Sequence, residues 1–176
     1  YHIVDIVNGH TRIAQGLGVA RSDILHHAWC DNGPNWRGVM LRSAAQVLAL
    51  KPDGAILAGL DVGVVGPTAE GGASAPRGQV GVVGGSDADG IAFEVRAFFP
   101  GNNGLAEDPV TGSLNAALAQ WLIGAGLAPA RYVASQGTAL GRAGRVHVEQ
   151  DGSDIWVGGH TVTCISGTVR LMQDRK

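Results

Sequence analysis

Alternating hydrophobic and polar residues predict strands over most of the C-terminal half of the chain. In IAFEVRAFFP, five apolar side chains share one face at a period of two: Ile91, Phe93, Val95, Ala97 and Phe99. Four later runs also predict strands, namely RYVASQG, GRVHVEQ, DIWVGG and TVTCISGTVRL, with a QDGS hairpin turn between the second and the third. Nearer the start, ILHHAWC and WRGVML predict two strands joined by the turn DNGPN.

TRIAQGLGV predicts one or two helical turns closed by glycine, DGAILAGL a short helical piece, and two further segments predict longer helices. SAAQVLALKPD has Ser43 in position to cap its N-terminus and Pro52 to end it. The second helix covers about residues 113–126 and is apolar on every side, with only Asn115 and Gln120 interrupting. A helix that is apolar all round is buried all round, and a helix of roughly 21 Å is too short to cross a membrane. We therefore expect it to lie inside a curved sheet.

The rest of the pattern decides the fold class. Residues 63–90 are rich in glycine, alanine and proline and predict a surface loop around one short strand, QVGVV. The strands and helices do not alternate as they do in βαβ units, so the sequence predicts an α+β fold.

Composition narrows the classes of function. Charged residues make up only 16% of the 176 residues, the net charge is −2 and aromatic residues are 5%, so nothing favours nucleic acid as a partner. The chain has neither a Gly-Lys-Ser/Thr loop nor a G-x-G-x-x-G fingerprint after a strand. No apolar run reaches 18 residues and the first residues do not resemble a signal peptide, so we expect a cytoplasmic protein without membrane partners.

The candidate chemistry lies at the start of the apolar helix, in the stretch EDPVTGS. The first N–H groups of a helix have no intrahelical partner and carry the positive end of its dipole. Thr111, Gly112 and Ser113 present these groups with little side-chain bulk. An anion such as a substrate carboxylate would satisfy them.

The two acids of this stretch allow more than one interpretation. Asp108 is either an N-cap, with Pro109 at the first helical position, or an acid that faces a cavity. Thr111 is an equally good cap. Glu107 adds a second carboxylate, which is more than capping requires, and adjacent acids point in different directions.

EDPVTGS resembles the signature loop of the PhzF-like, phenazine-biosynthesis-type isomerases. VRAFFP before it, and SQGTALGRAGRVHV and VGGHTVTCISGTV after it, extend the resemblance from GLGV to about residue 170. The resemblance implies the diaminopimelate epimerase-like fold, in which each of two similar halves is a curved, barrel-like, mixed or antiparallel sheet around a central buried helix. The pattern of elements predicts that architecture for one half.

The resemblance also implies roles for single residues. It makes Asp108 the catalytic acid, and it makes Gly112 and Ser113 backbone donors to the carboxylate of a small substrate. The implied chemistry is a proton shift without a cofactor, by acid and base groups on both sides of a cleft between the halves. At position 114 this chain has Leu where the family often has a small residue, which would narrow the cleft and leaves the substrate open.

The family's other essential groups, a catalytic Glu and a Gly-His motif, belong to the N-terminal half. Gly9 and His10 are followed by TRIAQGLG, which does not match that motif, so no role is assigned to them. We expect residues 1–22 to be an inter-domain segment and residues 23–176 to be the C-terminal domain, with a loop-rich insertion near 63–90.

This organisation predicts a fragment that is inactive without the N-terminal half or a second subunit, and that forms a homodimer through exposed apolar surface. Two alternatives remain open. The chain could be a non-catalytic domain that binds a small carboxylate, or a structural subunit.

Cysteine and histidine positions exclude other chemistries. Cys30 and Cys164 predict buried apolar roles, and Thr111 stands where the epimerase relatives have a thiol, which argues against a two-thiol racemase. His26 and His27 are adjacent in a predicted strand and face opposite sides, so we expect no metal site.

Overall fold

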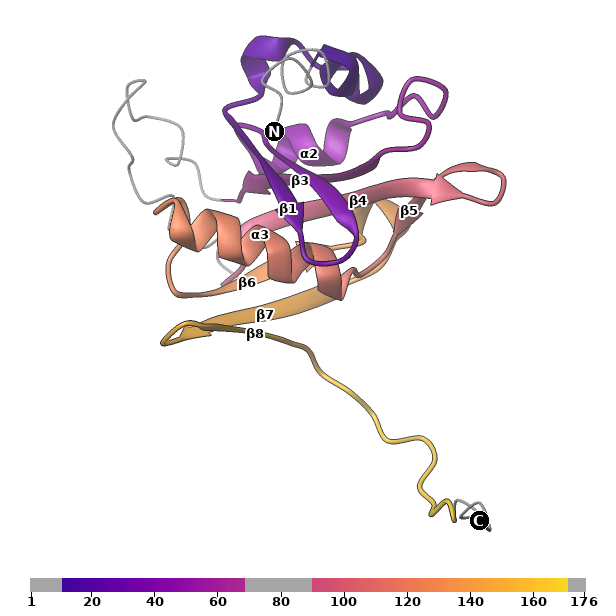
Figure 1. The fold of residues 1–176 in the computed structure, drawn as a ribbon, viewed down its shortest axis with the longest axis vertical. Coiled ribbons are helices and arrows are strands. Elements are labelled where there is room, and N and C mark those ends of the chain that lie inside the picture. The colour runs from indigo at the N-terminus through magenta and orange to yellow at the C-terminus, as the bar shows by residue number, and fades with distance from the viewer. Residues whose placement is uncertain (1–10, 69–89, 171–176) are drawn as a thin grey trace, which may run out of the picture.

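The computed structural model describes residues 11–68 and 90–170, which form one mixed sheet with helices on both faces (Figure 1). The order of the strands is β1-β2-β3-β4-β6-β7-β8, and β5 pairs with β4 as a branch. The β2/β3 and β4/β6 pairs are parallel and the other pairs are antiparallel. The strands are β1 (His26–Asp31), β2 (Asn35–Met40), β3 (Asp61–Pro67), β4 (Phe93–Gly101), β5 (Gly104–Asp108), β6 (Arg131–Gln136), β7 (Gly144–Asp151) and β8 (Asp154–Gly158).

Helix α3 (Gly112–Gly124) lies in the curve of this sheet. It packs against β1 and β2 at one end of the strand order and against β7 and β8 at the other, so the sheet curls around it as a half-barrel. Helix α2 (Ala44–Ala49) lies on the opposite face, against β3 and β4 (Figure 1). Residues 11–17 are helical, and η1 (Arg21–Asp23) and η2 (Thr138–Leu140) are short 3-10 turns. The predicted α+β class and the curved mixed sheet around a central helix are confirmed.

Most of α3 is buried, as its apolar sequence predicts. Two glycines of the sheet allow the close approach. A Cβ on Gly63 would stand 2.3 Å from Leu114 Cδ1, and a Cβ on Gly38 would stand 2.9 Å from Trp121 Cζ3. Space for the helix therefore comes from missing side chains on β3 and β2. The buried residues of α3 are Leu114, Asn115, Ala117, Leu118, Ala119 and Leu122.

Strand β4 is buried on both faces, because α3 covers one face of the sheet and α2 covers the other. Its predicted period-two face is confirmed, since Phe93, Val95 and Ala97 belong to the core around α3. On the opposite face, Phe98 belongs to a second core, between the sheet and α2. The same face of β4 carries Glu94, which is also buried.

Two short-range predictions are confirmed. The Ser43 hydroxyl accepts a hydrogen bond from the backbone N–H of Gln46 at 3.3 Å and so caps α2. The QDGS turn joins β7 to β8, with Gly152 at φ 60°, a conformation that suits glycine.

The strand predicted for TVTCISGTVRL is wrong. Residues 159–170 have no regular secondary structure and extend away from the end of β8 (Figure 1). Val162, Ile165 and Val169 are at least 84% exposed. A period-two pattern forms a strand only where a sheet edge accepts its backbone groups, and within the described ranges no strand pairs with this segment.

The loop predicted at 63–90 is wrong at its start, because β3 continues through Pro67. QVGVV and the Gly9-His10 pair lie outside the described residues. The domain boundary between residues 22 and 23 stays a prediction, although Ile13 and Leu17 are buried in the second core. None of the helices in the described ranges combines the length and apolar character needed to cross a lipid bilayer.

Candidate functional site

Helix α3 begins one residue after Thr111, which is the N-cap in extended conformation, with φ −118° and ψ 103°. The interpretation of Asp108 as N-cap with Pro109 at the first helical position is therefore wrong. Strand β5 continues through Asp108, so the chain is still in the sheet at the residue that would have to cap the helix. The Thr111 side chain does not cap the helix either: its hydroxyl donates to Asp108 Oδ2 at 2.9 Å and accepts from Gln136 Nε2 at 2.9 Å.

The first turn of α3 consequently presents backbone donors without a side-chain cap. The N–H groups of Gly112, Ser113 and Leu114 have no acceptor within the helix, since these are its first three residues. Gly112 is exposed, and a Cβ placed on it would meet no atom within 4 Å. The positive end of the helix dipole lies at these donors, which favours an anion at this position.

A buried amide, Gln136 at the end of β6, holds the turn in place. It is 0% exposed. Its Oε1 accepts from the Thr111 N–H at 3.1 Å and from Asn115 Nδ2 at 2.7 Å. Its Nε2 donates to the Asp108 carbonyl at 2.9 Å and to Thr111 Oγ1 at 2.9 Å. A glutamine amide has two donor and two acceptor positions, and here all four are used.

These contacts fix the direction of hydrogen bonding at Asp108. Because Gln136 donates to the Thr111 hydroxyl, that hydroxyl has its own hydrogen to give, and it donates it to Asp108 Oδ2. Within the described ranges, Oδ1 of Asp108 makes no hydrogen bond, and the residue is half-buried. Asp108 is therefore held by one oxygen, while the other remains available to a ligand or a proton.

Ser113 is hydrogen-bonded to the hairpin formed by β1 and β2. Its hydroxyl accepts from Trp36 Nε1 at 3.2 Å, and its carbonyl accepts from Asn32 Nδ2 at 2.8 Å. Asn32 lies in the turn between β1 and β2, so this hairpin is attached directly to the first turn of α3. The Ser113 N–H is left for an acceptor outside the helix.

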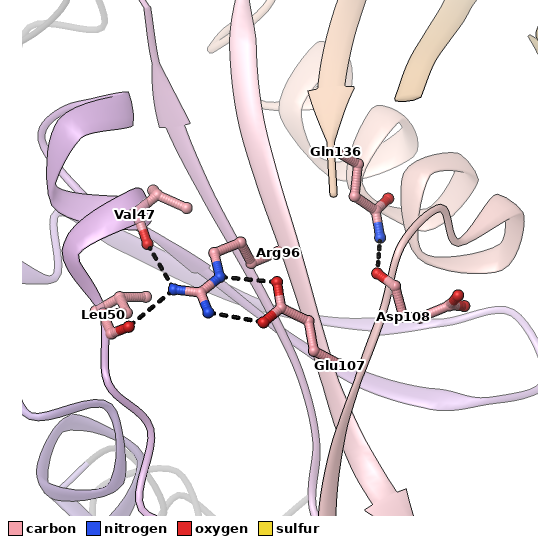
Figure 2. Close-up of polar contacts among 6 residues, drawn as sticks. All are labelled: Val47, Leu50, Arg96, Glu107, Asp108 and Gln136. Atoms are coloured by element: carbon pink, nitrogen blue, oxygen red, sulfur yellow. Dashed lines mark hydrogen bonds and ion pairs between the residues drawn. The ribbon is translucent and has the colours of Figure 1, made fainter. Parts of the chain in front are cut away.

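Glu107 and Asp108 have separate roles, and their side chains point apart (Figure 2). Arg96 donates to both oxygens of Glu107, at 2.9 Å from Nε and 2.7 Å from Nη2. The same guanidinium donates to the carbonyls of Val47 and Leu50 at the end of α2, at 3.2 and 2.9 Å. Glu107 thus completes a structural ion pair on the α2 face of the sheet, which leaves Asp108 as the one acid of the pair beside the start of α3.

Asp108 is hydrogen-bonded to Thr111, the residue that precedes Gly112 and Ser113, and the roles that the sequence assigns to these three residues stay predictions. Leu114 is expected from the sequence to narrow a cleft, but its side chain is fully buried against Gly63. A helical side chain two residues from the exposed Gly112 points into the sheet instead.

Sequence reasoning missed the groups that hold the turn: Asn32, Trp36, Asn115 and Gln136. A signal existed for the last two, since each is a polar residue on an otherwise apolar face. Asn115 interrupts the buried helix, and Gln136 follows Tyr132 and Ala134 on the face of β6 that packs on the core around α3. Their separation of 21 residues in the chain hides the bond between them.

Other reactive groups lie away from this site. Cys30 is buried, as predicted, and burial raises the pKa of its thiol to about 11, which keeps it protonated. Cys164 is exposed, so its predicted burial is wrong, because the segment that carries it leaves the sheet. In residues 11–68 and 90–170, no three His, Cys, Asp or Glu side chains are arranged to hold a metal ion.

Comparison with known proteins gives two kinds of match. Residues 6–167 match the family PhzC-PhzF, described as phenazine biosynthesis-like protein. The fold is similar to a PhzF-family phenazine biosynthesis protein of Enterococcus faecalis, with TM-score 0.53 and 22% identity over 82% of this chain and 45% of that one. It is also similar to a PhzF-family protein of Bacillus anthracis, with TM-score 0.55 and 13% identity over 84% of this chain and 50% of that one. The chain thus spans about half the length of these structures. No curated protein sequence matches it significantly.

Proposed function

The chain belongs to the phenazine biosynthesis-like (PhzC-PhzF) family, and from this premise we propose that it is the C-terminal half of a cofactor-independent isomerase or epimerase. The substrate is a small molecule with a carboxylate. The reaction is a proton shift between acid and base groups.

The single observation that carries the proposal is the uncapped start of α3. Three successive N–H groups, at residues 112–114, lack intrahelical acceptors because they open the helix, and the Thr111 side chain makes no capping hydrogen bond to them. A substrate carboxylate at this position accepts from these groups and is stabilised by the helix dipole. The anchors at Gln136 and Asn32 keep the donors in place before the substrate arrives, which lowers the cost of ordering them on binding.

Asp108 is the proposed acid of this half. Its Oδ2 is fixed by Thr111, so the carboxyl group has one defined orientation, and its Oδ1 is available to carry the proton. With the substrate held by its carboxylate, a carbon near Asp108 can receive or lose a proton.

The catalytic partner of Asp108 is proposed to lie in an N-terminal half, as the resemblance implies. A homodimer and a cytoplasmic location are part of the same proposal. The alternatives, a carboxylate-binding domain without catalysis and a structural subunit, differ from it in whether Asp108 takes part in turnover and in whether α3 binds an anion.

Titration with benzoate, followed in the ¹H–¹⁵N NMR spectrum, tests the binding step. We expect saturable shifts of the Gly112, Ser113 and Leu114 amides, with small shifts elsewhere. Benzamide, which has the same ring and no charge, is the matched control and should leave these signals in place. Equal shifts with benzamide, or none with benzoate, would remove the support for a carboxylate site.

A further inference from the structure

A second buried acid, Glu94 of β4, lies on the face of the sheet opposite α3. It is 4% exposed. Its Oε2 accepts from the Thr138 hydroxyl at 3.1 Å, while Oε1 is buried and has no hydrogen-bond partner among the residues that the structure describes. A buried carboxylate with an unsatisfied oxygen is costly, so its presence calls for a reason other than packing.

Glu94 ends a directed chain of hydrogen bonds. Arg145 donates from Nη1 to the Ser135 hydroxyl at 3.1 Å, and the Ser135 and Thr138 hydroxyls are 3.0 Å apart. A guanidinium can only donate, so Ser135 accepts from Arg145 and is free to donate to Thr138, which donates to Glu94. The chain therefore runs from a cation on β7 to a carboxylate on β4 and crosses the end of β6.

This series of hydrogen bonds lies on the opposite face of the sheet from the hydrogen bonds that Gln136 makes at the start of α3. Ser135 and Gln136 are consecutive in β6, so their side chains point to opposite faces of the sheet. Between Gln136 and Thr138 stands Gly137, at φ 87°, where an added Cβ would lie 2.6 Å from the Pro109 carbonyl oxygen. A shift of the Thr138 turn would therefore move the backbone that carries Gln136 and press on the loop that follows Asp108.

We propose that Glu94 is a positioning residue, which fixes the end of β6 through Thr138 and Ser135 and thereby places Gln136 at the start of α3. The inference deepens the proposed function and rests on it. Glu94 touches no substrate. Its effect reaches the carboxylate-binding turn through Gln136, which accepts from the Thr111 N–H.

The electrostatics of Glu94 agree with a residue held by its hydrogen bonds. Burial raises its pKa, and the hydrogen bond from Thr138, the nearby Ser135 hydroxyl and the charges of Arg145 and Arg96 oppose that rise. These residues come from β4, β6, β7 and the Thr138 turn. The paired strand β3 presents Gly66 at the position opposite Glu94 and adds no charge there.

The experiment compares Glu94→Leu and Thr138→Val, each of which breaks the chain, with Glu94→Gln, which keeps an acceptor for Thr138. Glu149→Leu is the control, because it removes an exposed carboxylate from the neighbouring β7. For each variant the measurements are the melting temperature, the benzoate Kd from the Gly112 and Ser113 amides, and the positions of the Thr111 amide and Gln136 side-chain NH₂ signals.

We expect Glu94→Leu and Thr138→Val to move the Thr111 and Gln136 signals and to weaken benzoate binding about tenfold, as one lost positioning contact of ~1.4 kcal/mol would do. Glu94→Gln and Glu149→Leu should stay within about twofold of the wild type. If one chain-breaking variant fails to fold, the other still decides.

Unmoved Thr111 and Gln136 signals in both chain-breaking variants would overturn the inference, as would an equal loss in Glu94→Gln. These signals are read without benzoate. A wild-type chain that does not bind benzoate would count against the proposed function, while the signals would still report on positioning.

Discussion

Replacing Gln136 with leucine tests whether this amide holds the start of α3. Leucine fills a similar volume and makes none of the four hydrogen bonds. The Thr111 N–H is then left without an acceptor in a residue that is 7% exposed, at a cost of about 1–3 kcal/mol. Asn115 keeps its bond to the Thr111 carbonyl at 2.9 Å, and water can reach the half-buried Asp108, so these two losses are smaller.

The sum is about 2–4 kcal/mol in the free energy of unfolding. For a chain of this size, each kcal/mol lowers the melting temperature by roughly 2–4 °C, so the expected decrease is about 5–15 °C. Differential scanning calorimetry and urea unfolding measure it. Loss of the anchored turn should also weaken benzoate binding at Gly112 and Ser113.

Two further variants show whether the stability lost in Gln136→Leu comes from the hydrogen bonds of Gln136. Gln120→Leu removes an exposed glutamine from α3 and should change stability by less than about 0.5 kcal/mol. Gln136→Glu keeps both acceptor contacts but turns a carboxylate oxygen toward the Asp108 carbonyl, so it should cost at least as much as leucine. A Gln136→Leu protein that melts within a degree of the wild type would refute the anchoring role.

Three further predictions concern other parts of the chain. Arg96→Met leaves Glu107 and two carbonyls at the end of α2 without their partner, and it should lower the free energy of unfolding in urea by about 3–5 kcal/mol. Arg131→Met breaks an exposed ion pair and should lower it by less than about 1 kcal/mol. Equal losses in the two variants would contradict the structural role of Arg96. Burial raises the pKa of Glu94 from its ordinary value of 4.5, so the folded state binds this proton more tightly than the unfolded state. The stability of the wild type relative to Glu94→Gln should therefore fall as the pH rises from about 4.5 to the folded-state pKa. A stability difference that stays constant between pH 4 and 8 would contradict this reasoning. The 176-residue chain alone should bind benzoate yet show no isomerase turnover, and clear turnover by the purified chain would overturn the proposal that its catalytic partner lies in an N-terminal half.

The fold and the site were predictable to different depths. The class, the strands from β1 to β8 other than β3 and β5, and the burial of α3 follow from periodicity and from a helix without a polar face. The strand assigned to residues 161–171 failed because periodicity reports only that a segment can pair, while pairing depends on an edge elsewhere in the fold. The start of β3 was hidden for a related reason, since Gly63 and Gly66 lower its apparent strand propensity, although they admit Leu114 and α2.

At the site, residue type and spacing located the turn, and tertiary contacts decided its details. The sequence offered Asp108 and Thr111 as alternative caps, and only the structure shows that Thr111 occupies the cap position while its side chain bonds to Asp108 and Gln136. The sequence left Glu107 as a carboxylate beyond what capping requires, and its partner is seen only in the structure, where Arg96 lies beside it. Bonds between residues distant in the chain, such as Asn32 to Ser113, cannot be read from spacing.

The most direct test of the proposed function is the rate at which the full-length protein exchanges a carbon-bound hydrogen of the proposed carboxylate substrate with solvent deuterium, compared between the wild type and Asp108→Asn. Asparagine can still accept the Thr111 hydrogen bond through its amide oxygen, so the fold and melting temperature should be kept. As the amide cannot donate the proton of a carboxylic acid to carbon, exchange should slow by about 100-fold or more. An Asp108→Asn protein that exchanges at the wild-type rate would contradict the account and leave the turn at Gly112 and Ser113 as a binding feature alone.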